Sequence, residues 1–221
     1  MSRKIPDQKP IWDRKHAEGD HEKLRHSPNP LAKLAEPYLS KRSKILELGC
    51  GVGGDAVFFT DKGHKVIATD VSDVVVEQNK RHFANTDVKF SVLDMRKPLP
   101  YKPESFDVVY VNLSLHYYSH DKTRKIVKEV AKVLKPDGIF AFACKSVDDF
   151  HYGKGDEVEK DVFVSEKGRV RHLFSIPYTR ELLEGMFDIG YLDMVEEEYN
   201  GQRSNILRCI AKKSGQNRGQ L

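Results

Sequence analysis

Residues 44–59, with the sequence KILELGCGVGGDAVFF, constrain the fold of this chain more than any other stretch. Residues 45–48 are a short apolar run bounded by glycines, which predicts a buried strand and not a helix. The glycine-rich loop that follows can turn sharply and lie against a ligand, because no Cβ atoms stand in the way. Residues 55–62 predict a helix that ends at Gly63. A strand, a glycine loop and a helix N-terminus in this order form the ligand-binding corner of an open α/β sheet.

Two cofactor classes are compatible with this corner. Gly49, Gly51 and Gly54 fit the G-x-G-x-x-G pattern of dinucleotide sites, a weak signal alone, and a dinucleotide pyrophosphate favours free N–H groups and positive potential. The same stretch also fits E-x-G-x-G-x-G from Glu47 to Gly53, and in this pattern it resembles motif I of the class I S-adenosylmethionine (SAM) methyltransferases. SAM brings an ammonium and a sulfonium, which a carboxylate at the strand end such as Glu47 would help to hold. A glycine-rich turn without a ligand is the third alternative, and the downstream spacing disfavours it.

Composition indicates a single soluble domain. A chain of 221 residues with 39% hydrophobic and 32% charged residues can bury a full-sized core. No apolar run approaches the roughly 18 residues of a membrane span, and the first ten residues contain no apolar segment typical of a signal peptide. Three cysteines without C-x-x-C spacing indicate free thiols in a reducing compartment and argue against a zinc site. We therefore expect a cytoplasmic protein without a metal, in which Cys50 is a small residue of the cofactor loop and not a nucleophile.

The charge balance sets expectations for partners. The net charge of +4 is mild, and the basic residues alternate with 33 acids instead of forming a block. Nucleic acid is permitted by this balance but not indicated, because a dedicated binder usually has a denser basic stripe. We expect a small-molecule substrate, no membrane partner, and either a monomer or a homodimer.

The N-terminal residues 1–28 are polar and predict an arm or short helix that lies over the rest of the protein. Trp12 is the only tryptophan, and it either anchors this arm to the core or lines the mouth of the active site. Residues 30–39 carry a helical apolar stripe preceded by prolines, which favours a helix at the start of the main domain, residues 29–213.

A carboxylate follows the second predicted strand. Residues 65–69 predict that strand, and Asp70 comes 21 residues after Gly49. At this spacing an acid can accept hydrogen bonds from a ribose diol, which fits both SAM and NAD. We therefore include Asp70 and the adjacent Val71 among the cofactor-binding residues. The alternative is that Asp70 caps the next helix, residues 73–83, but Ser72 is better placed as that cap.

The third predicted strand, residues 88–93, ends at Asp94 and Met95. The methyltransferase resemblance implies that Asp94 reaches the adenine amino group and that Met95 packs beside the adenine ring. An aspartate after a strand is also a common turn former, so this role rests on the resemblance.

Residues 106–115 are the most apolar stretch and predict a central strand buried on both faces. Asn112 near its end is included among the cofactor-binding residues. His116 and Tyr117 follow the strand, where polar aromatic residues face the ligand crevice, so both are candidate catalytic residues. His116 suits proton transfer because its unperturbed pKa is near neutrality, although it could be an ordinary loop residue. The i, i+4 spacing of His116 and His120 lacks an assured third ligand and does not predict a metal site.

The remaining segments support the same family. Residues 123–134 predict an amphipathic helix that the L-K-P-D-G segment ends, followed by a strand over residues 139–144; this combination is typical of class I methyltransferases. Residues 179–187 predict another helix, capped by Thr179. Residues 190–199 and 203–212, joined by Asn200 and Gly201, predict a terminal hairpin. The resemblance implies a three-layer α/β/α Rossmann-like fold with strand order 3-2-1-4-5-7-6 and strand 7 antiparallel. Residues 145–177 are expected to form a substrate lid, and residues 214–221 a disordered tail.

Within the superfamily, the chain is most similar to the tellurite-resistance and thiopurine methyltransferases. The similarity rests on Trp12 and Asp13, on the G-C-G-x-G-x-D-A-like loop, and on residues 63–70, GHKVIATD. The doubled glycine at positions 53 and 54 and the insertion after the fifth strand depart from that pattern. The chain also lacks N-P-P-Y after its fourth strand, which lowers the expectation of a nucleic-acid acceptor.

The expected function is direct transfer of a methyl group from SAM to a small molecule. An RNA- or protein-directed methyltransferase, a non-catalytic SAM-binding regulatory protein and an NAD-dependent oxidoreductase are the alternatives.

Overall fold

The structure is a computed structural model that describes residues 5–19, 22–25, 27–199 and 202–215. Its centre is a seven-stranded sheet in the order β3-β2-β1-β4-β5-β10-β9. The first five strands in this order run parallel, and β10 is antiparallel to both β5 and β9, which confirms the predicted topology. The strands are β1 Lys44–Leu48, β2 Lys65–Asp70, β3 Lys89–Val92, β4 Phe106–Asn112, β5 Leu134–Lys145, β9 Phe187–Tyr199 and β10 Gln202–Lys213.

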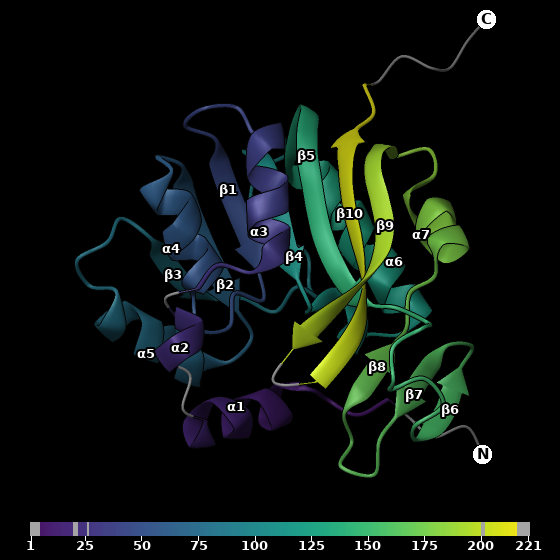
Figure 1. Ribbon diagram of the computed structural model, residues 1–221. Coiled ribbons are helices and arrows are strands. Elements are labelled where there is room, and N and C mark those ends of the chain that lie inside the picture. Colours follow the sequence, from purple (N-terminus) through teal and green to yellow (C-terminus); the bar gives the residue numbers. More distant parts are fainter. Residues whose placement is uncertain (1–4, 20–21, 26, 200–201, 216–221) are drawn as a thin grey trace, which may run out of the picture.

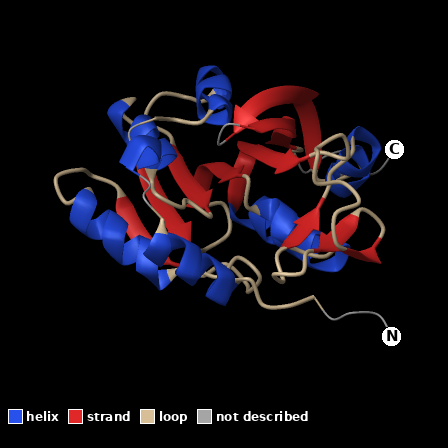
Figure 2. Ribbon diagram, turned by 60° about the horizontal axis from the view of Figure 1, so that its bottom comes forward, coloured by secondary structure: helices blue, strands red, loops and turns tan. Residues whose placement is uncertain are grey.

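Helices cover both faces of this sheet and create two apolar cores (Figures 1 and 2). One face packs against α3 (Pro30–Ala35), α4 (Gly54–Asp61) and α5 (Asp73–His82), which contribute Leu31, Phe59 and Val76 to the core. The other face packs against α6 (His120–Val133) and α7 (Ile176–Leu183). Because β4 is covered on both sides, its residues from Val108 to Val111 are almost completely buried.

Two further units lie at the carboxyl ends of the parallel strands, at the lower end of Figure 1. The N-terminal segment forms α1 (Lys9–Glu18) and α2 (Glu22–Arg25). The insertion after β5 forms a small antiparallel sheet of β6 (Asp156–Glu159), β7 (Val162–Val164) and β8 (Val170–His172). The Gln8 amide joins the two units, because its Nε2 donates to the Gly168 carbonyl at 3.0 Å and its Oε1 accepts from the Val170 amide at 3.1 Å.

Several element boundaries differ from the prediction for local reasons. The last helix, α7, begins at Ile176 and not at residue 179, because the Ser175 side chain accepts from the Tyr178 amide and caps it. The 14-residue helix α6 begins at His120, because Ser119 caps it in the same way. The helix predicted over residues 30–39 ends at Ala35 and continues as a 3-10 turn, Glu36–Tyr38.

The two strands next to the site also differ from prediction. The central strand β4 ends at Asn112 instead of residue 115, and a 3-10 turn, η2 (Leu115–Tyr117), follows it. The K-P-D-G segment does not separate helix from strand as expected. It belongs to β5, where Asp137 has a φ of 60° and the pairing with β4 shifts register. The predicted turn residues Asn200 and Gly201 lie outside the described residues, and Tyr199 pairs with Gln202 on either side of them.

Asp55 connects the start of α4 to the N-terminal segment and to the central strand. Its side chain accepts from the Asn29 amide at 2.7 Å, from Asn29 Nδ2 at 2.9 Å and from the Tyr110 hydroxyl at 2.7 Å. Tyr110 is fully buried and Asp55 is 4% exposed, so water cannot replace these bonds.

Replacing Asp55 with alanine is therefore expected to lower the free energy of unfolding by about 2–4 kcal/mol, since each buried donor left without an acceptor costs ~1–3 kcal/mol. Urea denaturation measures this loss. Asp61→Ala, at the exposed end of the same helix, should change the stability by no more than about 0.5 kcal/mol. Equal losses in both variants would contradict the role assigned to Asp55.

Candidate functional site

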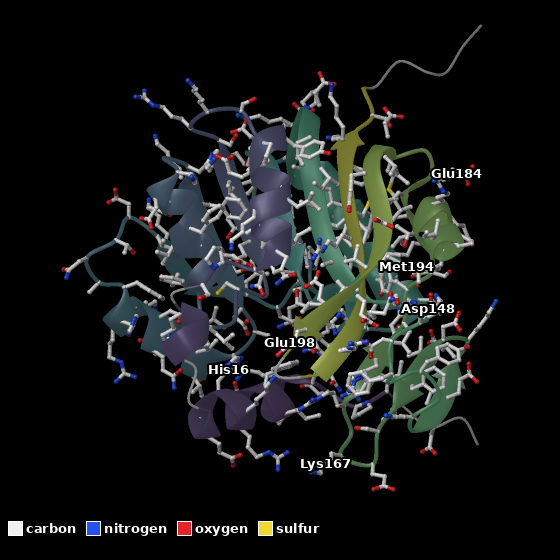
Figure 3. The ribbon with its side chains drawn as sticks, viewed as in Figure 1. His16, Asp148, Lys167, Glu184, Met194 and Glu198 are labelled. Carbon is white, nitrogen blue, oxygen red and sulfur yellow. The ribbon has the colours of Figure 1, made fainter. Side chains whose placement is uncertain are left out.

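A cavity opens at the carboxyl ends of β1, β2 and β4 and is covered by α1. Its wall comes from the glycine loop, the ends of the three strands, the η2 turn and the N-terminal segment. His16, marked in Figure 3, is one of the α1 residues in this wall. The lining residues are Gln8, Lys9, Trp12, Lys15, His16, Leu24, Ser27, Asn29, Glu47, Gly49, Cys50, Gly51, Val52, Gly54, Asp55, Asp70, Val71, Leu93, Met95, Arg96, Asn112, Leu113, Ser114, Tyr117 and Tyr118.

The glycine loop leaves space that side chains would fill. Gly49 has a φ of +78°, and a Cβ at this position would lie 2.5 Å from the Ser114 side chain. Gly51 has a φ of +49°, and a Cβ there would meet no atom within 4 Å. The amides of Gly49 and Cys50 both donate to the Thr69 carbonyl at 2.8 Å, which fixes the loop against the end of β2. The open side of Gly51 therefore allows a ligand to approach the backbone closely.

Glu47 provides a buried carboxylate in the cavity wall. The residue is 2% exposed, and its Oε2 atom has no hydrogen-bond partner. Burial, together with the charges of Asp55 and Asp70, raises the pKa of Glu47 well above its usual value. An acid in this state gains a favourable partner when a cation enters the cavity. The acidic side chains of the cavity wall therefore fit the positively charged ammonium and sulfonium of SAM and do not fit a negatively charged pyrophosphate.

Asp70 holds the glycine loop and the start of α5 together. Its Oδ2 accepts from the Gly51 amide and its Oδ1 from the Ser72 amide, both at 2.9 Å. Burial raises the pKa of Asp70, and these backbone hydrogen bonds oppose that rise. Ser72 precedes α5 as predicted, but its side chain makes no capping bond. Asp70 thus faces the cavity, and its bond to the Ser72 amide lies before the first turn of α5 and does not cap that helix.

Most of the predicted cofactor-binding residues line this cavity. They are Glu47, Gly49, Cys50, Gly51, Asp70, Val71, Met95 and Asn112. Burial raises the pKa of the Cys50 thiol well above its usual value, so the thiol stays protonated, as expected for a residue that is not a nucleophile. Contact of these residues with a cofactor stays a prediction.

Two predicted cofactor residues lie outside the wall. A Cβ on Gly53 would lie 3.0 Å from the Phe83 ring and 3.1 Å from the Phe90 ring, so this glycine is needed for packing against α5 and β3. Asp94 is engaged by Arg96, whose guanidinium donates to both carboxylate oxygens at 2.8 Å. Asp94 is not among the lining residues of the cavity, whereas its neighbours Met95 and Arg96 are.

The N-terminal segment supplies wall residues that the sequence did not identify. Arg96 Nη1 donates to Asp7 at 2.8 Å, and Lys9 on α1 forms ion pairs with Asp13 and with Asp73 on α5. The pairs Arg96–Asp7 and Lys9–Asp73 join residues far apart in the sequence, so no local pattern could have indicated them. Trp12 lines the cavity, which supports the second of its two predicted roles.

The two candidate catalytic residues differ in position. Tyr117 lines the cavity, and its ring packs edge-on against Trp12 with 4.8 Å between centroids. His116 lies behind it, 1% exposed, with 4.3 Å between the His116 and Tyr117 rings. The Nδ1 atom of His116 has no hydrogen-bond partner. Burial, followed by the charges of Lys145 and Arg171, holds the pKa of His116 well below its usual value, so the imidazole is neutral at pH 7.

Two absences apply to the described part of the chain. It contains no group of three or more histidine, cysteine or acidic side chains that could hold a metal ion. None of its helices has the length and apolar character needed to cross a membrane.

Comparison with known proteins shows that the chain is similar to methyltransferases. Residues 45–138 match the family model described as a methyltransferase domain. The chain is 33% identical over 106 residues to the sterol 4-C-methyltransferase strm-1 of Caenorhabditis elegans, an alignment that covers 46% of this chain and 31% of that protein. It is 32% identical over 112 residues to the uncharacterized methyltransferase sll0829 of Synechocystis, with 51% and 50% covered. The chain thus spans half or less of the length of these curated relatives.

A solved structure extends the comparison to nearly the whole chain. The 1,6-didemethyltoxoflavin-N1-methyltransferase of Burkholderia thailandensis, with bound 1,6-didemethyltoxoflavin and S-adenosylhomocysteine, superposes with a TM-score of 0.75. The two proteins are 20% identical, and the superposition covers 93% of this chain and 87% of that one. At this identity the likeness establishes the fold.

Proposed function

We propose that this chain, whose residues 45–138 match a methyltransferase domain, is a methyltransferase of the class I type. It uses SAM as its cofactor and transfers a methyl group by direct displacement to a small-molecule acceptor. The observation that carries the proposal is the Glu47 carboxylate, which lies buried in the wall beside the open glycine loop and whose Oε2 atom has no hydrogen-bond partner. A cationic nucleoside relieves the cost of that buried acid, whereas a diphosphate would increase it.

The residues of the cavity have distinct parts in this reaction. SAM, when bound, would supply a methyl group attached to a sulfonium, and loss of this methyl group would leave the sulfur as a neutral thioether. Glu47 attracts the cationic end of the cofactor, Asp70 accepts from the ribose hydroxyls, and Met95 packs beside the adenine. Tyr117 contacts the acceptor, and α1 excludes water from the cavity. Positioning of this kind can lower a barrier by about 7–11 kcal/mol without a covalent enzyme intermediate.

Calorimetric titration with SAM, S-adenosylhomocysteine and NAD tests the cofactor assignment. We expect SAM and S-adenosylhomocysteine to bind with dissociation constants at least about 100-fold below that of NAD, because the Glu47 carboxylate opposes the pyrophosphate. Tight binding of NAD with no binding of SAM would overturn the proposal. Cofactor binding without methyl transfer to any acceptor would favour the non-catalytic, regulatory alternative.

The acceptor class rests on two observations. The names of similar proteins refer to sterol and toxoflavin substrates, both small molecules. The cavity that α1 and Trp12 line on one side also suits a small acceptor better than a nucleic acid. The resemblance to the tellurite-resistance and thiopurine enzymes makes a soft chalcogen or thiolate acceptor the finer proposal. Methyl incorporation into RNA or protein, with binding retained above about 200 mM salt, would favour the macromolecular alternative.

A further inference from the structure

Lys15 lines the cavity, and two arginine side chains outside the lining lie close to it. We call Lys15, Arg169 and Arg171 the basic site. Lys15 lies on α1, Arg171 on β8, and Arg169 directly before β8. Trp12 lies between these elements, with Lys15 Nζ 4.6 Å and Arg169 Cζ 5.8 Å from its ring centroid. Arg171 lies near enough to Lys15 and Arg169 for their charges to interact.

The basic site has no acidic partner in the part of the chain that the structure describes. None of the ion pairs formed there includes Lys15, Arg169 or Arg171. The Nε donor of Arg169 is buried without an acceptor. Asp149 acts on Arg171 only at longer range, because the oxygens of this buried carboxylate already bond Lys145, His151, Ser204 and Asn205.

Gathering these cations is costly for the free protein. All three are partly buried, and like charges in such surroundings repel one another. The effect is visible at Lys15, where burial and then the charges of Arg169 and Arg171 lower the pKa to about 8. The pKa of Arg171 is lowered by burial and by Arg169. A bound anion would remove this repulsion and give the Arg169 donor an acceptor.

The aromatic side chains beside the basic site indicate what the anion is attached to. Trp12 and Tyr117 both line the cavity, with their rings in edge-to-face contact. Aromatic faces and edges of this kind favour a flat apolar ring, and the cations next to them favour an oxyanion on that ring.

We propose that the methyl acceptor is an aromatic oxyanion, with its carboxylate or phosphate bound by Lys15, Arg169 and Arg171 and its ring held by Trp12 and Tyr117. This inference rests on the proposed function, because it places the acceptor in the same cavity as SAM. It narrows that function from a small molecule to a negatively charged aromatic one.

Three probes with the same fluorophenyl ring test the proposal: 4-fluorobenzoate, 4-fluorophenyl phosphate and uncharged 4-fluorobenzamide, which has the shape of the benzoate. Binding is measured by ¹⁹F NMR and by the fluorescence of Trp12, which reports the site directly because it is the only tryptophan. We expect one or both anions to bind at least tenfold more tightly than the amide, with and without S-adenosylhomocysteine. The stronger of the two anions identifies the carboxylate or the phosphate as the natural group.

Matched variants assign the binding to the basic site. Arg171→Gln and Lys15→Gln should each weaken anion binding about tenfold or more, while the affinity for S-adenosylhomocysteine changes less than about twofold. Lys167→Gln is the control, because Lys167 lies exposed at the outer end of the loop before β8 and forms no ion pair among the described residues (Figure 3). It should leave anion binding unchanged.

Two results would overturn the inference: binding of both anions no tighter than that of benzamide, or equal effects of the Arg171 and Lys167 substitutions. If S-adenosylhomocysteine still binds, either result rejects the aromatic oxyanion as the acceptor and leaves the proposed methyl transfer unaffected. Loss of S-adenosylhomocysteine binding with retained, Arg171-dependent anion binding would instead overturn the proposed function and support the basic site.

Discussion

Replacing Glu47 with glutamine is expected to weaken SAM binding by about 10- to 100-fold and, at the same time, to stabilise the ligand-free protein. The loss of affinity follows because hydrogen bonds to charged groups contribute ~1.5–3 kcal/mol, and glutamine keeps the shape without the charge. The gain in stability follows because the unpartnered Oε2 of Glu47 is buried, and glutamine removes the acid that burial and the neighbouring carboxylates disfavour. A lower SAM affinity together with a higher stability of the ligand-free protein would indicate that this acid serves ligand binding and not folding.

The pH dependence follows from the raised pKa of Glu47. Between the usual value of 4.5 and the raised value in the folded protein, the folded state binds more protons than the unfolded state. The unfolding free energy therefore falls as the pH rises through this window. SAM affinity should change in the opposite direction, because the ionised carboxylate is the form that holds a cation. Titrations in buffers of different ionisation enthalpy should detect proton release on SAM binding, and Glu47→Gln should abolish it.

Thermal denaturation and calorimetry on Glu47→Gln provide the measurement. A stability gain of 1 kcal/mol would raise the Tm by about 2–4 °C for a chain of this size. Glu184→Gln is the matched control, since Glu184 is exposed beyond α7 and far from His16 in Figure 3. If Glu47→Gln lowered the Tm and left SAM affinity unchanged, Glu47 would be a structural residue and the cofactor assignment would lose its main support.

Replacing His116 with alanine is expected to reduce kcat by about 10²–10⁴-fold if the acceptor must lose a proton, which is the usual contribution of a general base. His116 has an unpartnered Nδ1 and a lowered pKa, so it is in its base form at neutral pH. The kcat of the unaltered protein should therefore be constant near pH 7 and should decline only at acidic pH. A thiolate or chalcogen acceptor needs no base, and kcat would then change less than tenfold.

The buried position of His116 requires a control for packing. His116→Gln keeps a polar side chain of similar size, and its Tm and S-adenosylhomocysteine affinity show whether the cavity is intact. Added imidazole should restore part of the activity of His116→Ala if a base is missing, and should have no effect if only packing is lost. The contrary outcome is a His116→Ala variant that has an intact cavity, gains no activity from imidazole and keeps the original pH dependence in its residual activity. In that case Tyr117 would remain as the residue that acts on the acceptor.

Local patterns in the sequence determined the scaffold. The apolar run before Gly49, the spacing to Asp70 and the amphipathic helix before β5 each depend on residues near one another in the chain. Hydrophobic periodicity and turn chemistry act over such short ranges. They were therefore sufficient for the individual strands and for most of the cavity residues on β1, β2 and β4, whereas the strand order followed from the resemblance to class I methyltransferases.

Tertiary contacts decided the rest of the site. Gly53 and Asp94 match a motif, but packing against Phe83 and Phe90 uses the glycine and Arg96 uses the carboxylate. The closure of α1 over the cavity depends on contacts such as that between Gln8 and Val170, which are 162 residues apart. The basic site brings Lys15 close to Arg169, which precedes β8, and to Arg171 on β8 in the same way. No periodicity encodes such pairs, because their proximity results only when the inserted sheet and the N-terminal helix pack against the same end of the domain.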